Sequence, residues 1–337
     1  MNIAINGFGR IGKNFLRVIL NDQNAKKKLN VVAINVGPNT DIKAVAHGFK
    51  YDSLLGTFSG KVEQDDKFLF IDNFKIRLFA VADPKDIVWS KLNIEWVVDA
   101  TGHFTKREMA EKHIDAGAKR VLITAPANDE DIAIVPGVNL NLYKKNKHKI
   151  VSLCSCTSNA AMVMLKIIDD NFEIEKAAMS TVHAYTNTQP LLDVDPKMKN
   201  LRKSRAGAIN IIPTTTGAME VVDKVIPSLK GKVTGCALRV PIDKVSIIDL
   251  GVITKKKMTK ESIHKAFITA SKKDLKGIVD VNFVPLVSCD FKNNDHSVII
   301  EADLTDVLGD HFAKVFGWYD NEWGYSQRLK DFLLAVI

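Results

Sequence analysis

Residues 6–12 read Asn6-Gly7-Phe8-Gly9-Arg10-Ile11-Gly12, and this stretch decides the fold of the chain. It follows a short apolar run, Asn2 to Ile5, that predicts a strand, and it leads into a segment with an apolar helical face. Gly7 allows a tight turn, Gly9 lets a pyrophosphate approach the backbone, and Gly12 lets the helix pack on the strand. In this strand–turn–helix context the pattern predicts a dinucleotide-binding unit.

The segment Asn30 to Asn35 predicts the next strand. An acidic residue at its end would accept a hydrogen bond from the adenosine ribose. Val36 stands there instead, and the first acid is Asp41. Because Val36 neither bonds a ribose hydroxyl nor repels a 2′-phosphate, both NAD and NADP remain candidates.

Strands and helices then alternate, which indicates a mostly parallel, doubly wound α/β sheet. The expected strands are 75–80, 96–100, 120–124 and 149–153, with a helix over 106–116. Ligands of such sheets bind at the carboxyl ends of the strands. Gly102, Thr124 and Cys156 fall at such ends, so we expect the dinucleotide and the thiol to share one crevice.

Cys156 lies in Ser155-Cys156-Thr157-Ser158-Asn159, between a predicted strand and a predicted helix. A helix N-terminus favours negative charge, so the pattern predicts a reactive thiol with a pKa below the ~8.5 of a free cysteine. The alternative is a buried structural cysteine. His183 follows a predicted strand over 177–182 and could hold a thiolate and shuttle protons. Sequence spacing alone does not show that the two side chains meet.

Several anion-binding side chains follow in the second half of the chain. Thr214-Thr215-Thr216-Gly217 is expected at a helix N-terminus, where hydroxyls and a glycine suit an anion. Arg202 follows an irregular stretch from Asp193 to Asn200, and Arg239 adds a planar cationic donor. Each could equally be a cap or a surface charge. Together they predict anion sites beside the thiol.

The second half is expected to form an α+β domain with a mostly antiparallel or mixed sheet. Its strands are predicted over 245–253, 280–289, 297–303 and 315–319, with helices over 260–272 and 326–337.

Composition sets further bounds. The chain has 337 residues, enough for two domains, and a net charge of +8 from 47 basic and 39 acidic residues. The lysine runs 26–28, 144–145 and 255–257 indicate solvated loops or helix ends, with attraction of phosphorylated ligands or incidental nucleic-acid binding as alternatives. Four cysteines show no metal-site spacing, so no metal and a reducing, cytoplasmic setting are expected. We expect no signal peptide and no membrane span.

Taken together, the motifs resemble the phosphorylating glyceraldehyde-3-phosphate dehydrogenase family over essentially the whole chain. The markers that carry this resemblance are residues 6–12, Ser155-Cys156-Thr157, His183 to Thr186, Pro213 to Gly217, Arg239-Val240-Pro241 and Trp318 to Tyr325.

The resemblance implies a Rossmann domain formed by residues 1–154 and 321–337 and a catalytic domain over 155–320. It implies oxidation of D-glyceraldehyde 3-phosphate with inorganic phosphate and NAD(P), giving 1,3-bisphosphoglycerate through a hemithioacetal and a thioester. The enzyme would be a homotetramer working in glycolysis or gluconeogenesis.

The resemblance also implies roles for individual residues. Cys156 would be the nucleophile and His183 the base. The phosphate groups would lie against Ser155, Thr157, Thr186, Arg202 or the adjacent Lys203, Thr216, Gly217 and Arg239. The cofactor would contact Gly7, Gly9, Arg10, Ile11, Gly12, Thr124 and Asn321.

This sequence departs from the family pattern at several positions, which include the unusual Cys154 and a loop before Arg202 that is one residue longer. The family usually has an acid in place of Val36 and often a basic residue in place of Ala82, which leaves the choice of cofactor open. Its usual second cysteine is Ala160 here. Two other functions are compatible with the sequence: an erythrose-4-phosphate dehydrogenase that hydrolyses the thioester, and a protein that binds RNA in the dinucleotide crevice.

Overall fold

The computed structural model describes residues 1–195 and 201–337. These residues form two compact units. The first comprises Met1–Ile134, Asn141–Cys154 and Ser326–Ile337, and the second comprises Val135–Leu140 and Ser155–Tyr325. The structure thus places residues 135–140 and 321–325 with the second unit, where the sequence suggests the first.

The helices are α1 Arg10–Asn21, α2 Gln23–Lys28, α3 Val45–Lys50, α4 Arg107–Asp115, α5 Cys156–Phe172, α6 Val222–Val225, α7 Lys260–Lys272 and α8 Trp323–Ala335. The strands are β1 Asn2–Asn6, β2 Asn30–Asn35, β3 Val62–Gln64, β4 Phe68–Ile71, β5 Phe74–Phe79, β6 Trp96–Asp99, β7 Arg120–Ile123, β8 Ile132–Ala133, β9 Ile150–Ser152, β10 Ile174–Ala184, β11 Ile212–Thr214, β12 Val233–Val240, β13 Ser246–Thr254, β14 Val279–Asn282, β15 Val298–Leu308 and β16 Phe312–Tyr319.

The first unit is built on a nine-stranded sheet with the order β3-β4-β5-β2-β1-β6-β7-β9-β8. The strands from β5 to β8 pair in parallel, as the alternating pattern predicts. The antiparallel hairpin β3-β4-β5 extends one edge, and its first two strands were not predicted. The Rossmann-type fold class is confirmed.

The glycine turn after β1 has the geometry that its sequence implies. Gly7 has φ +91°, in the left-handed region that glycine tolerates, and its N–H donates to the carbonyl of Asn35 at 2.9 Å. A Cβ built on Gly12 would lie only 2.2 Å from the carbonyl oxygen of Gly7. Only glycine therefore lets α1 begin this close to the strand end.

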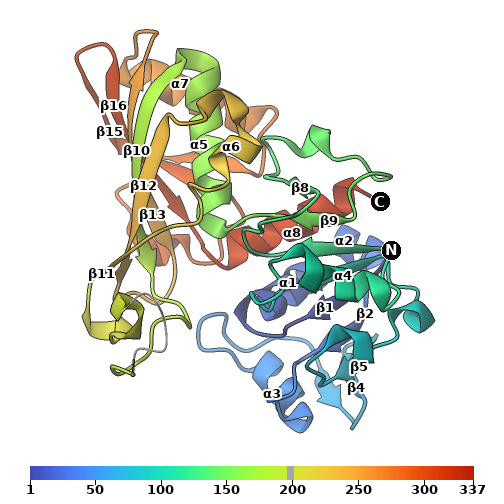
Figure 1. Ribbon diagram of the computed structural model, residues 1–337. Coiled ribbons are helices and arrows are strands. Elements are labelled where there is room, and N and C mark those ends of the chain that lie inside the picture. Colours follow the sequence, from blue (N-terminus) through green and yellow to red (C-terminus); the bar gives the residue numbers. More distant parts are fainter. Residues whose placement is uncertain (196–200) are drawn as a thin grey trace. The chain divides into compact units, whose positions relative to one another are not determined.

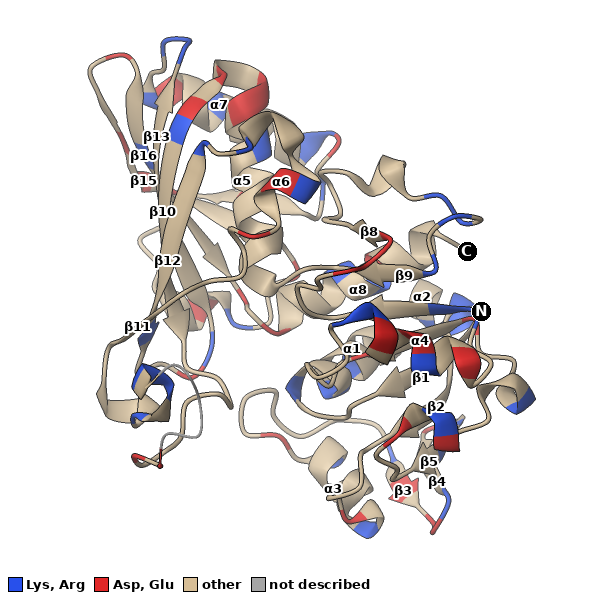
Figure 2. Cartoon of the chain, in the orientation of Figure 1, with Lys and Arg blue, Asp and Glu red and all other residues tan. Residues whose placement is uncertain are grey.

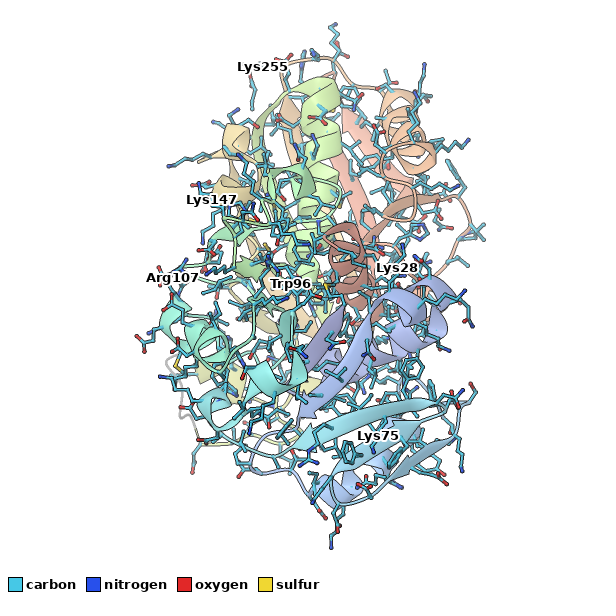
Figure 3. The ribbon with its side chains drawn as sticks, turned by 90° about the vertical axis from the view of Figure 1, so that its right-hand side faces the viewer. Lys28, Lys75, Trp96, Arg107, Lys147 and Lys255 are labelled. Carbon is cyan, nitrogen blue, oxygen red and sulfur yellow. The ribbon has the colours of Figure 1, made fainter. Side chains whose placement is uncertain are left out.

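The C-terminal helix α8 contributes to the core of the first unit. Phe332 packs edge-on against Trp96 of β6, with ring centroids 5.5 Å apart, and against Tyr143. Trp96 is buried among the side chains of neighbouring elements (Figure 3). Lys330 also pairs with Asp22 at 2.8 Å. The end of the chain thus completes the unit in which the chain begins.

The second unit is built on a seven-stranded mixed sheet with the order β11-β12-β10-β13-β16-β15-β14. Two pairs, β10–β12 and β14–β15, are parallel, and the others are antiparallel. Helices α5 and α7 lie on the same side of this sheet (Figure 1). The predicted strand over 280–289 is wrong beyond Asn282, where β14 ends. Pro285 follows in the loop, and a proline cannot donate to a strand ladder.

Basic segments are interspersed with acidic ones along the part of the chain that the structure describes (Figure 2). In the run 255–257, Lys256 pairs with Glu173 at 2.8 Å and Lys257 pairs with Asp310 at 2.6 Å. These ion pairs favour the interpretation of this lysine run as a solvated turn and not as a nucleic-acid site.

The described residues hold no candidate membrane span and no candidate metal cluster. No helix among them has the length and apolarity needed to cross a membrane. Nor do three or more His, Cys, Asp or Glu side chains gather there in an arrangement that could hold a metal ion.

Candidate active site

Cys156 is the first residue of α5. Ser155 caps this helix: its hydroxyl accepts from the N–H of Ser158 at 3.0 Å, and the two side chains form a reciprocal capping box. The apolar residues that follow bury the helix against the sheet. The predicted strand-to-helix position of the thiol is therefore found in the structure.

His183 reaches Cys156 because a helix and a strand of similar length separate them. From Cys156, α5 runs ~24 Å at 1.5 Å per residue. After the left-handed residue Glu173, β10 returns ~30 Å before it reaches His183. His183 Nε2 consequently lies 3.6 Å from the sulfur of Cys156. The structure brings together the two residues whose contact the sequence left open.

Arg239 lies beside His183 because β10 and β12 pair in parallel register. One guanidinium nitrogen lies 2.5 Å from His183 Nδ1 and donates to the carbonyl of Ala184 at 3.1 Å. His183 Nδ1 also lies 2.7 Å from that carbonyl oxygen. Burial and the guanidinium charge lower the pKa of His183 to about 3. The imidazole is therefore neutral at pH 7 and can accept a proton.

The expectation of a low pKa for Cys156 is wrong for this structure. Burial raises the pKa of the thiol above its ordinary value, and this outweighs the opposing effects of the Arg239 charge and of hydrogen bonds from Thr157. The sequence indicated that Cys156 lies at a helix terminus, but it did not indicate that its sulfur is buried. Cys156 and His183 thus form a neutral thiol–imidazole pair in the ligand-free protein.

Tyr319 is a site residue for which the sequence predicted no role. Its hydroxyl lies 2.9 Å from the hydroxyl of Thr157 and 2.7 Å from that of Thr181. Its ring meets the imidazole of His183 edge-on, with centroids 5.9 Å apart. Burial raises the pKa of Tyr319, so the phenol stays protonated. Its place in the conspicuous run Trp318 to Tyr325 was the available signal.

The candidate phosphate-binding residues lie on several elements of the second unit. Thr186 follows β10 directly, and its hydroxyl lies 2.9 Å from that of Thr188. Arg202 lies on the 3₁₀ turn Leu201–Ser204, which packs against β11, the strand next to that of Arg239. Part of the irregular stretch before it, residues 196–200, lies outside the described residues.

The expected helix N-terminus at Thr216 and Gly217 is wrong. Both residues lie in a turn after β11, and the helix that follows, α6, begins only at Val222 and has four residues. The hydroxyl of Thr216 accepts from the N–H of Ala218 at 3.3 Å. This turn can offer hydroxyl and backbone donors to an anion, but no helix dipole.

The first unit holds a hollow of about 420 Å³ at the carboxyl ends of β1, β2 and β6. Its lining, all within the described part of the chain, includes no Asp, Glu, Lys or Arg. The residues that line it are Asn6, Gly7, Phe8, Gly9, Asn35, Val36, Gly37, Pro38, Asn39, Thr40, Val81, Ala82, Ala100, Thr101, His103 and Phe104. The open turn at Gly7 and Gly9 makes the hollow fit a dinucleotide.

The other candidate cofactor residues have defined places. Arg10 and Ile11 open α1, and Arg10 pairs with Asp52 at 2.5 Å. Thr124 follows β7, where its N–H donates to the carbonyl of Asp99 at 3.0 Å. Asn321 belongs to the second unit, where its side-chain oxygen accepts from the N–H of Val245 at 3.1 Å.

Comparison with known proteins agrees with this arrangement. Residues 1–107 match the family model described as "Glyceraldehyde 3-phosphate dehydrogenase, NAD binding domain". Residues 155–321 match that of the corresponding C-terminal domain.

Similar curated proteins cover almost the whole chain. The chain is 47% identical to the chloroplastic glyceraldehyde-3-phosphate dehydrogenase A of Chlamydomonas reinhardtii, over 98% of this chain and 87% of that protein. It is 44% identical to glyceraldehyde-3-phosphate dehydrogenase 2 of Streptomyces avermitilis, over 100% of this chain and 98% of that protein. For glyceraldehyde-3-phosphate dehydrogenase 2 of Bacillus subtilis the identity is 43%, over 100% of this chain and 96% of that protein. With family-model matches in both halves and this similarity over its full length, the chain belongs to the glyceraldehyde-3-phosphate dehydrogenase family.

Proposed function

We propose that this protein oxidises D-glyceraldehyde 3-phosphate in the presence of inorganic phosphate to give 1,3-bisphosphoglycerate, with NAD or NADP as cofactor. The observation that carries the proposal is the 3.6 Å contact between the sulfur of Cys156 and Nε2 of His183, with the Arg239 guanidinium alongside. A nucleophile paired with a neutral base and flanked by a cation suits a phosphorylated aldehyde.

In the first step, the sulfur of Cys156 bonds to the aldehyde carbon while its proton passes to His183 Nε2. That proton then goes to the aldehyde oxygen, which gives a hemithioacetal. His183 next removes the hydroxyl proton as hydride leaves the carbon, and a thioester remains on Cys156. The bound dinucleotide supplies the hydride acceptor.

A phosphate oxygen then attacks the thioester carbon, and the carbon–sulfur bond breaks. His183 returns its proton to the departing sulfur, which restores the neutral pair. We infer that Thr186, Arg239 and Arg202 hold the phosphate of the substrate. The attacking phosphate would contact Ser155, Thr157, Thr216 and Gly217.

The cofactor residues of the first unit would be Gly7, Gly9, Arg10, Ile11, Gly12 and Thr124. The open space at Gly9, where an added Cβ would meet nothing within 4 Å, supports this assignment, because it lets a pyrophosphate approach the backbone. Asn321 would donate from its amide nitrogen to the nicotinamide carboxamide. These residues bind and orient the dinucleotide.

The hollow at Val36 predicts that both dinucleotides are used. Since no carboxylate lines it, nothing there repels a 2′-phosphate. Val36→Asp should raise KM for NADP by about tenfold or more, as ~1.4 kcal/mol of repulsion suffices, and should leave KM for NAD within a few-fold. Steady-state kinetics with both cofactors would measure this. An equal change in KM for NAD and for NADP would contradict the role of Val36 in accepting both cofactors.

We further infer a cytoplasmic homotetramer working in glycolysis or gluconeogenesis. None of the four cysteines forms a disulfide, which supports a reducing compartment. The sheet face of the second unit opposite α5 holds a hollow of about 780 Å³, whose lining includes Ala178, Ile253 and Phe312. This face carries exposed apolar residues beside charged ones such as Lys232 and Asp249, and such a mixed surface suits contact with a second copy of the chain.

The direct test is absorbance of reduced nicotinamide with glyceraldehyde 3-phosphate in four mixtures: NAD or NADP, each with and without phosphate. We expect sustained turnover only with phosphate, and none in Cys156→Ser. Sustained turnover without phosphate would mean that the thioester is hydrolysed, and would contradict the proposal. No turnover in any mixture would reject it.

A further inference from the structure

Val245 has an unusual backbone conformation. Its φ is +72°, in the left-handed region that a β-branched side chain rarely enters. The residue is fully buried and packs with Phe291 and Ile299. Strain of this kind persists only where the surroundings hold it, and it occurs often at functional sites.

The strained residue determines the direction of one side chain. The N–H of Val245 donates to Oδ1 of Asn321 at 3.1 Å, and the hydroxyl of Ser246 lies 3.5 Å from the same oxygen. Because a backbone N–H can only donate, the amide oxygen of Asn321 must face Val245. The amide nitrogen therefore faces away from it, with N–H groups available to an acceptor. An extended φ at Val245 would direct its N–H elsewhere relative to β13.

A buried ion pair holds both partners of this bond. Lys244, next to Val245, has a fully buried side chain whose Nζ lies 3.0 Å from Asp320, next to Asn321. Lys244 Nζ also donates to the side-chain oxygen of Asn293 at 2.7 Å. The carboxylate of Asp320 accepts from three backbone N–H groups, those of Asn293 (2.7 Å), Glu322 (2.9 Å) and Trp323 (2.8 Å).

Desolvation makes a buried ion pair a weak source of stability. This pair adjoins the strained Val245 and Asn321, whose N–H···O bond orients the Asn321 amide. We propose that Lys244 and Asp320 are positioning residues that fix the amide of Asn321 and thereby its recognition of the nicotinamide carboxamide. The proposal rests on the proposed function.

The test is a double variant, Lys244→Met with Asp320→Asn. It removes both charges together, so that no unpaired charge stays buried, and it keeps one oxygen at position 320 for the N–H groups of Glu322 and Trp323. We expect kcat/KM for NAD to fall at least tenfold. Alkylation of Cys156 without cofactor should keep its rate, because it does not involve Asn321.

A matched control exists in the residues next to Lys244 and Asn293. Lys292 and Asp243 form a partly exposed pair at 2.6 Å. Lys292→Met with Asp243→Asn makes the same chemical change, and its kcat/KM should stay within twofold of wild type. If wild type turns over NAD and the buried-pair variant behaves like this control, the positioning role is overturned while the proposed function stands. A wild-type protein without turnover would defeat both.

A double-mutant cycle with Asn321→Ala separates positioning from general damage. If the pair acts through Asn321, removing its charges in the Asn321→Ala background should change kcat/KM less than twofold. The same tenfold loss in both backgrounds would overturn the proposal.

Asn321→Asp gives an answer even if the double variant does not fold. Aspartate keeps an oxygen for the Val245 N–H but offers no donor. Its kcat/KM should fall to the level of Asn321→Ala with an unchanged melting temperature. Wild-type kcat/KM in Asn321→Asp would show that the amide is no donor, and would also overturn the proposal.

Discussion

At the scale of single residues, the reactive pair depends on burial as much as on charge. Burial raises the pKa of Cys156, and burial together with the Arg239 guanidinium lowers that of His183. Both effects favour neutral forms. Proton transfer then accompanies the attack by sulfur and does not precede it.

This account predicts the pH dependence of thiol alkylation. In the ligand-free protein the midpoint for Cys156 should lie above the ~8.5 of a free thiol. Arg239→Gln should move it higher, because the guanidinium charge lowers the pKa of Cys156. Iodoacetamide labelling followed by mass spectrometry would measure both, with exposed Cys289 as an internal reference. A midpoint below that of Cys289, or one unmoved by Arg239→Gln, would contradict the account.

A further prediction at this scale concerns the hydroxyl of Tyr319. Tyr319→Phe keeps the ring against His183 but leaves the hydroxyls of Thr157 and Thr181 without this partner. Unfolding free energy should drop by ~1–3 kcal/mol, the usual result of orphaning buried polar groups. Denaturant titration would measure it, and an unchanged midpoint would contradict the role given to this hydroxyl.

At the scale of elements, the glycine turn permits a matched comparison. A Cβ at Gly12 would collide with the carbonyl of Gly7, whereas a Cβ at Gly9 meets nothing within 4 Å. Gly12→Ala should therefore destabilise the protein by at least the ~1–3 kcal/mol of an overpacked site. Gly9→Ala should keep the wild-type melting temperature and weaken dinucleotide binding. Thermal unfolding and cofactor titration separate the two, and equal melting temperatures would contradict the packing argument.

Elements with local signals could be predicted from the sequence. The helix Lys260–Lys272 has a capping residue, Thr259, and a helical apolar period, and its predicted bounds were right. Strand β14 was predicted too long because the apolar residues after Asn282 resemble a continuing strand, although Pro285 among them cannot donate to a strand ladder. The hairpin β3-β4-β5 was missed in part because its pairing depends on neighbours that a single segment does not reveal.

In the candidate site, too, some features could be predicted from local sequence and others could not. The position of Cys156 at a helix start follows from local pattern, and so does the Gly7 turn. The contact with His183, the register that brings in Arg239, and the hydroxyl network of Tyr319 depend on long-range pairing of strands. The pKa of Cys156 depends on burial, which no local pattern contains.

At the scale of the molecule, the sheet face of the second unit opposite α5 predicts self-association. Ile253 and Phe312 line its hollow and are at least one-third exposed. Sedimentation should show a species about four times the 37.4 kDa of one chain. Ile253→Asp with Phe312→Glu should reduce that mass, while exposed Leu142→Asp, in the first unit, should not. A wild-type protein that sediments as a monomer would contradict the assembly.

The matched lengths of α5 and β10 also constrain how this protein can change over evolution. Substitutions between Cys156 and His183 alter packing, but insertion or deletion of one residue in β10 would turn the imidazole to the opposite face of the sheet. One residue more or less in α5 would rotate the rest of the helix by ~100°. Homologous enzymes that keep this chemistry should therefore vary here in residue type and hardly at all in the number of residues, whereas surface loops elsewhere can gain or lose residues freely.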